Sequence, residues 1–211
     1  MAIVHNTTLT PSKLELLTSW LPTRPWYSGG AGGPRLAKAG GFRLDDPAGA
    51  VGIEFMVVTD TSADYLVPLT YRGAPLAGAE SALIGTMEHG VLGPRWAYDG
   101  CQDPVAVAQL VALIEGRVQA QAQSLSDTPD RNVTRSYTGA GPLAEVTGAV
   151  DDSEATVLGT AQGSSLRLHR VLRPTDDDAI PPDAIGHVSG TWRQADGTLA
   201  RAVFVIVRPR S

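Results

Sequence analysis

The stretch VGIEFMVVT (Val51–Thr59), followed after a short turn by DYLVPLTY (Asp64–Tyr71), predicts the fold of the first half of the chain. Both runs are rich in the β-branched and aromatic residues that favour strands. The polar segment Asp60–Ala63 between them is typical of a tight turn. Phe42–Leu44 adds an earlier strand, and consecutive short strands with short turns indicate an antiparallel meander.

One charged side chain interrupts the first of these strands. Glu54 lies between Ile53 and Phe55 in an otherwise apolar run. Successive side chains of a strand point to opposite faces of the sheet. On an amphipathic strand Glu54 would therefore point outward, and we expect it to be exposed to solvent.

Two helices are expected to cover the sheet. The first has Thr10 or Ser12 as its cap and ends before Pro22. The second runs from Asp103 to about Gln123, because a capping aspartate and a first-turn proline precede apolar residues at helical spacing. Those apolar residues are Val107, Leu110, Val111 and Ile114.

The chain changes character after the second helix. Residues 124–131 are polar, contain Asp and Pro, and resemble a linker. We therefore predict a domain over residues 1–125 and a β-rich region over residues 132–211. The fold class is α+β: an antiparallel sheet with covering helices, then a mostly antiparallel second half. The β-rich runs of this half are Val133–Tyr137, Ala144–Val150, Ala155–Thr160, Leu166–Leu172, His187–Arg193 and Leu199–Val207.

Composition excludes several classes of protein. A net charge of -5 argues against nucleic acid as a partner, because phosphate backbones favour clustered Lys and Arg. No apolar run is long enough to span a membrane, and the first ten residues do not resemble a signal peptide, so we expect a cytoplasmic protein. The single cysteine, Cys101, cannot form an internal disulfide, and no metal framework is expected.

Most of the basic residues are arginines. Of 17 Lys plus Arg, only Lys13 and Lys38 are lysines. The glycine-rich stretch 28–34 continues into Arg35 rather than the Lys-Ser or Lys-Thr of a phosphate-binding loop, so no cofactor is expected. Nucleophilic catalysis would have to use Cys101 or His89, which flank one predicted strand, although free cysteines are commonly buried and inert.

Four aromatic side chains are candidates for a ligand platform. Trp26 and Tyr27 adjoin the glycine-rich loop, and Trp96 and Tyr98 share a later strand. Aromatic rings can stack on the faces of sugars, but large aromatic residues are also common core anchors. Both interpretations remain open from the sequence.

The first half resembles the maltokinase N-terminal cap domain over roughly residues 10–115. In that family the cap precedes a kinase of the aminoglycoside-phosphotransferase type, which acts on maltose or amino sugars. The phrases that carry the resemblance are Leu14-x-x-Leu17-x-x-Trp20-Leu21-Pro22-x-Arg24-x-Trp26-Tyr27-x-Gly29, Tyr65–Leu69, and Ala97-Tyr98-Asp99 followed by Asp103-Pro104.

The second half resembles a degenerate ATP-binding lobe of such a kinase. Ser165–Leu172 is similar to the strand that carries the ATP lysine, with Arg167 near the lysine position. Phosphoryl transfer needs that lysine and two aspartates near the metal ions. No lysine follows Lys38, His89-Gly90 continues into Val91 instead of the Asp of an HGD loop, and no DFG- or DFE-like phrase is present. We therefore expect no autonomous kinase activity.

These features predict a stand-alone, cap-like protein without the kinase catalytic lobe. Its expected role is that of a non-catalytic accessory or regulatory protein in sugar or glucan metabolism, which binds a protein partner or a second copy of itself. The alternative is a small-ligand binding module for a sugar or nucleotide, built on the four aromatic residues named above. An enzyme that uses Cys101 or His89 is a third possibility.

Overall fold

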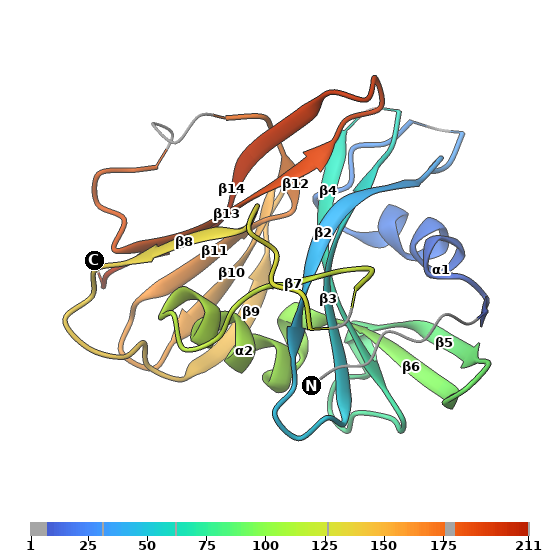
Figure 1. Ribbon diagram of the computed structural model, residues 1–211, viewed down its shortest axis with the longest axis horizontal. Coiled ribbons are helices and arrows are strands. Elements are labelled where there is room, and N and C mark those ends of the chain that lie inside the picture. The colour runs from blue at the N-terminus through green and yellow to red at the C-terminus, as the bar shows by residue number, and fades with distance from the viewer. Residues whose placement is uncertain (1–7, 31, 62, 126, 176–179, 211) are drawn as a thin grey trace.

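The computed structural model describes residues 8–30, 32–61, 63–125, 127–175 and 180–210 (Figure 1). Strands dominate these residues. They are β1 (Leu9–Thr10), β2 (Ala37–Asp45), β3 (Val51–Thr59), β4 (Asp64–Arg72), β5 (Leu83–His89), β6 (Gly93–Asp99), β7 (Gln121–Ala122), β8 (Thr134–Tyr137), β9 (Val146–Asp151), β10 (Ala155–Thr160), β11 (Ser165–His169), β12 (Val171–Leu172), β13 (Gly186–Arg193) and β14 (Leu199–Arg208).

All of these strands belong to one sheet with antiparallel pairings. Its order is β1-β5-β6-β4-β3-β2-β13-β14-β11-β10-β9, and β7, β8 and β12 pair with β2, β13 and β4 beside that path. The meander predicted from the sequence is confirmed, since β3 and β4 occupy the predicted runs and β2 is a longer version of the predicted strand. Short 3-10 turns, η1 (Leu21–Thr23), η2 (Glu80–Ala82) and η3 (Gly100–Gln102), connect some elements.

The first helix, α1 (Lys13–Trp20), begins with a capping box. The Ser12 hydroxyl accepts a hydrogen bond from the Glu15 backbone N–H, and the Glu15 carboxylate accepts one from the Ser12 N–H. This reciprocal pair satisfies two of the four amides that a helix start leaves unpaired. Of the two predicted caps, Ser12 is the one that the structure uses.

The second helix, α2 (Pro104–Ile114), is shorter than predicted. Asp103 caps it by accepting a hydrogen bond from the Val105 N–H, as expected. The predicted end near Gln123 is wrong, because Gly116 adopts a φ of 78° and its N–H bonds back to Leu113. A positive φ suits glycine and ends the helix.

The central strands bury both of their faces. Phe55 of β3 belongs to the larger hydrophobic cluster, which includes Leu110 of α2 and Leu158 of β10. Met56, the next residue, belongs to a second cluster together with Leu17 of α1. Figure 1 shows α1 on one side of β2, β3 and β4, and the strands of the second half on the other.

The two halves share strand pairing and core. Gly40 of β2 pairs with Trp192 of β13, and the indole N–H of Trp192 donates to Asp64 of β4 at 2.7 Å. Val171 of β12 pairs with Tyr65 of β4. The larger cluster therefore draws residues from both sides of the predicted linker. The division into domains at residues 125 and 132 stays a prediction.

The fold class needs a correction. The structure is mostly antiparallel β, and α1 and α2 have only 8 and 11 residues, so the α+β description with covering helices overstated the helical part. The cause is that strands β9–β14, rather than a long helix, supply most of the cover for the inner face of the meander. No helix in the described ranges is long and apolar enough to cross a membrane.

Candidate functional site

Glu54 is buried within β3, and only 3% of the residue is exposed. The expectation that it points to solvent is therefore wrong. Alternation does place Glu54 on the face opposite Ile53 and Phe55, but α1 packs on that face and covers it. Burying an unpaired carboxylate costs several kcal/mol, so the site requires compensating partners.

Four side chains supply these partners from different elements. Oε2 of Glu54 accepts a hydrogen bond from Nζ of Lys13 at 2.5 Å and one from the Tyr71 hydroxyl at 2.9 Å. Oε1 accepts one from the Gln123 amide at 3.1 Å. Nζ of Lys38 lies 4.0 Å from the same Oε1. The carboxylate thus has donors on both of its oxygens.

The two ammonium groups at this site belong to the only lysines in the chain. Lys13 is the first residue of α1, and Lys38 lies near the start of β2. Arg43 faces Glu54 across the β2–β3 register. Both lysines of a chain that otherwise uses arginine therefore converge on one buried carboxylate. We call Lys13, Lys38, Glu54, Tyr71 and Gln123 the lysine–glutamate cluster.

The cluster perturbs the ionisation of its members. Partial burial lowers the pKa of Lys38, and the neighbouring Lys13 charge lowers it further, while Glu54 opposes the shift. Burial raises the pKa of the Tyr71 hydroxyl well above its usual value, and the Glu54 charge adds to this. Tyr71 is therefore a neutral donor, and its ring lies 4.8 Å from the Lys13 ammonium. Chemically, the cluster offers one tightly paired ammonium and one loosely held amine.

The aromatic residues predicted to bind a ligand fall into two groups. Trp26 is buried beside Trp20 and Tyr65, with ring centroids 5.8 and 5.9 Å away. The ring of the half-buried Tyr27 lies 5.5 Å from the Tyr65 ring and is tilted against it by 37°, and the Tyr27 hydroxyl donates a hydrogen bond to Asp60.

The other two aromatic residues lie in a separate small cluster. Tyr98 is buried, so its ring is not accessible to solvent. Its hydroxyl accepts a hydrogen bond from the Leu76 N–H. Trp96 is half-buried beside it. Trp26 and Tyr27 therefore lie in one hydrophobic cluster, and Trp96 and Tyr98 lie in another. The structure does not bring the two pairs together. Ligand binding by these four residues stays a prediction.

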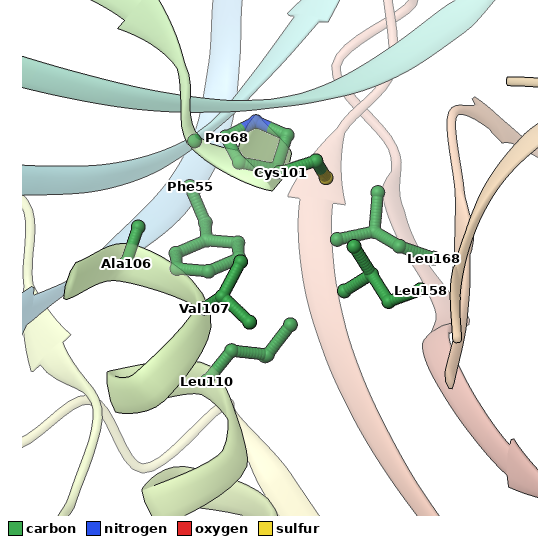
Figure 2. Close-up of a pocket in the computed structure, with 9 residues that line it drawn as sticks. Phe55, Pro68, Cys101, Ala106, Val107, Leu110, Leu158 and Leu168 are labelled. Atoms are coloured by element: carbon green, nitrogen blue, oxygen red, sulfur yellow. The ribbon is translucent and has the colours of Figure 1, made fainter. Parts of the chain in front are cut away.

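Cys101 is buried, with apolar side chains on one side and the charged Arg170 and Asp99 near enough to act on its thiol. It borders a gap between α2, β3, β10 and β11 that is too small to hold a water molecule (Figure 2). Burial raises the pKa of the thiol to about 12, so the sulfur is protonated near neutral pH. Nδ1 of His89 accepts hydrogen bonds from the Val91 and Leu92 amides in the β5–β6 turn. Cys101 and His89 therefore have separate surroundings: the thiol borders the interior gap, and the imidazole caps the β5–β6 turn.

A buried arginine connects the two halves. Arg170 is 0% exposed, and its guanidinium donates to Asp99 at 2.5 Å and to Thr156 at 2.6 Å. It also lies 5.1 Å from the centre of the Trp26 ring. Arg167, which the resemblance places near the position of an ATP lysine, binds Asp152 through two hydrogen bonds.

Within the described residues, no group of three or more His, Cys, Asp or Glu side chains is arranged to hold a metal ion. Sequence reasoning singled out Glu54 and noted the scarcity of lysine, but it did not connect these two observations. Tyr71 and Gln123 were missed as partners, because they lie 17 and 69 residues from Glu54 along the chain. The informative signal was the restriction of lysine to two positions.

Comparison with known proteins supports the resemblance stated above. Residues 20–103 match the family model of the maltokinase N-terminal cap domain. This segment extends from the last residue of α1 to the cap of α2, and it contains Lys38, Glu54 and Tyr71 but neither Lys13 nor Gln123. It is narrower than the predicted extent of residues 10–115. A search of curated proteins found no significant match.

Proposed function

We propose that this chain, with its segment related to the maltokinase N-terminal cap, is a non-catalytic accessory or regulatory protein of sugar or glucan metabolism that binds a protein partner. The match over residues 20–103 carries the proposal. It relates this region to a domain named after a sugar kinase, while the rest of the chain has no lysine after Lys38 and no HGD-, DFG- or DFE-like phrase.

The contacts of the second half support a non-catalytic role. Arg167 has its guanidinium bound to Asp152, and that carboxylate also accepts the Glu154 and Ala155 amides. A planar guanidinium is a poor substitute for the compact ammonium that pairs with phosphates. No lysine occurs after Lys38, and both lysines lie at the lysine–glutamate cluster.

Two measurements test this proposal. The first incubates the purified chain with ATP, Mg²⁺ and maltose or glucosamine and follows phosphoryl transfer by mass spectrometry of the sugar. We expect no turnover above a heat-denatured control. Turnover that disappears in the Arg167→Ala variant, with Arg173→Ala as the matched surface control, would show that the second half is catalytic and would refute the non-catalytic role.

The second measurement addresses the protein partner. Candidates captured from the source cells are purified and titrated against the chain by calorimetry, while light scattering gives the mass of the chain alone. A stoichiometric complex with an enzyme of sugar or glucan metabolism, reproduced with both purified components, supports the proposal. A chain that stays monomeric and forms no complex with any purified candidate contradicts it.

The alternative proposal, a small-ligand module, rests on Tyr27 and Trp96, which are only half-buried. A ligand at one hundred times its Kd stabilises a protein by about 2.7 kcal/mol, which corresponds to a rise in Tm of roughly 5–10 °C for a chain of this size. Thermal-shift screening with maltose, glucosamine and ATP measures this rise. A shift that Tyr27→Ala or Trp96→Ala removes supports the module, and no shift with any compound eliminates it.

A further inference from the structure

The two lysines of the chain hold unequal positions at Glu54. Nζ of Lys13 is 2.5 Å from Oε2, within hydrogen-bond distance, and lies against the Tyr71 ring. Nζ of Lys38 is 4.0 Å from Oε1, beyond hydrogen-bond distance, while Gln123 donates to that oxygen at 3.1 Å. The hydrogen bonds to Glu54 therefore come from Lys13, Tyr71 and Gln123, and none of them comes from Lys38.

Solvent exposure follows the same order. The side chain of Lys38 is 42% exposed, against 30% for Lys13 and 4% for Glu54. Lys38 is thus the more accessible amine and the more weakly paired one. The charged groups that act on Lys38 are Glu54 and Lys13, and Arg43 lies opposite Glu54 in the β2–β3 register.

From this geometry we propose that Lys38 is a site of covalent acylation by acyl thioesters, with Lys13 serving as the resident counter-ion that keeps Glu54 paired after Lys38 has lost its charge. The inference does not depend on the proposed function. It concerns the amine chemistry of this cluster, whatever partner or ligand the chain binds.

The reaction balances without any further reagent. The Lys38 ammonium first releases a proton to solvent, and its neutral Nζ then attacks the thioester carbonyl carbon. The new C–N bond forms as the C–S bond breaks, and the sulfur leaves as a thiol. Burial lowers the pKa of Lys38, the Glu54 charge opposes this, and the Lys13 charge adds to the lowering. The net lower pKa increases the fraction of neutral amine that can attack.

The product fits the site. An acylated Lys38 is a neutral amide at a position where no hydrogen bond to Glu54 existed, so nothing is lost except a 4.0 Å electrostatic contact. Acylation of Lys13 would instead remove the donor at 2.5 Å and leave a buried carboxylate with fewer partners. Selectivity for Lys38 therefore has two sources: its free amine is the more accessible one, and its acylation leaves the hydrogen bonds of Glu54 intact.

The experiment uses the full chain and a small thioester, S-acetyl-N-acetylcysteamine, at pH 8. Cleavage after Arg35 separates Lys13 from Lys38, so peptide mass spectrometry gives an initial acetylation rate for each. We expect Lys38 to react faster than Lys13, because its amine is more exposed and makes no hydrogen bond to Glu54, whereas Lys13 is held by one at 2.5 Å. In urea the ratio should approach one. A ratio of one or less in the folded chain, or a ratio unchanged by urea, overturns the proposal.

Two matched variants test the product side. Lys38→Gln, which mimics the acetylated residue, should keep Tm within about 2 °C of the wild type, as expected for a weakly paired surface charge. Lys13→Gln should lower Tm by clearly more. Equal losses in the two variants, or a larger loss for Lys38→Gln, show that Lys13 is not the resident counter-ion and overturn the proposal.

Discussion

Replacing Arg170 with methionine tests the energetic role of the buried contact between the halves. The guanidinium is fully buried and donates to Asp99 and Thr156. Methionine has a similar length and no charge, so the substitution removes both donors and leaves the Asp99 carboxylate, 94% buried as a side chain, without its cation. Removing one partner of a buried ion pair costs about 3–5 kcal/mol, because the other charge stays desolvated.

The structure places the expected loss near the lower end of that range. Nη1 of Arg170 has no hydrogen-bond partner among the described residues, and a buried unsatisfied donor costs about 1–3 kcal/mol. Methionine relieves this cost and keeps an apolar contact with the Trp26 ring. We therefore expect Arg170→Met to lower the free energy of unfolding by about 3 kcal/mol.

The assay is urea denaturation followed by tryptophan fluorescence, with two further variants. Asp99→Asn in the Arg170→Met background removes the stranded charge but keeps an Oδ1 acceptor for the Cys101 amide, so it should recover at least about 1 kcal/mol. Arg173→Met is the control, because its ion pair with Glu154 is 70% and 46% exposed and contributes about 0–1 kcal/mol. A loss for Arg170→Met no larger than that of the control would refute the reasoning, as would a double variant less stable than the single one.

Three further predictions follow from particular contacts. Tyr71→Phe removes one hydrogen bond to the buried Glu54 carboxylate and should lower the free energy of unfolding by about 1.5–3 kcal/mol in the same urea assay; an unchanged midpoint contradicts this. Cys101, with its pKa raised to about 12, should react with iodoacetamide at pH 8 on the order of a thousandfold more slowly in the folded chain than in urea, and comparable rates would disprove its burial. The hydrogen bonds from Arg167 lower the pKa of Asp152 from 3.8 to about 2, so its contribution to stability is complete above pH 4 and is lost as the pH falls toward 2. Asp152→Asn should therefore cost up to about 1 kcal/mol at pH 6 and nearly nothing at pH 2, measured by thermal unfolding across this range; a cost independent of pH contradicts the assignment.

The sequence was sufficient for elements whose signals are local. Val51–Thr59 is a strand with the predicted bounds, because its β-branched residues and flanking turns act within a few positions. The Asp103 cap was found for the same reason. The end of α2 was misplaced because the apolar residues up to Ile114 do not show where the helix stops, whereas the positive φ of Gly116 stops it.

The candidate site was only partly predictable. Strand alternation correctly separates Glu54 from Phe55, but it carries no information on whether a helix packs on the second face. The charge partners of buried residues are also distant in the chain: Lys13 lies 41 residues from Glu54, and Arg170 lies 71 residues from Asp99. A single sequence contains no local signal for such pairs.

The position of Arg170 has a consequence for the order in which the chain can mature during synthesis. Three parts of the N-terminal half leave the ribosome well before residue 170: Asp99, Trp26 and strand β4. Arg170 supplies the cation for Asp99 and the contact with Trp26, and β12, which pairs with β4, follows directly after it. Until then the carboxylate keeps its hydration, and the meander cannot reach its final packing at this point. The N-terminal half therefore completes its interior only after translation has passed residue 172, so any factor that shields nascent chains has about seventy codons in which to act.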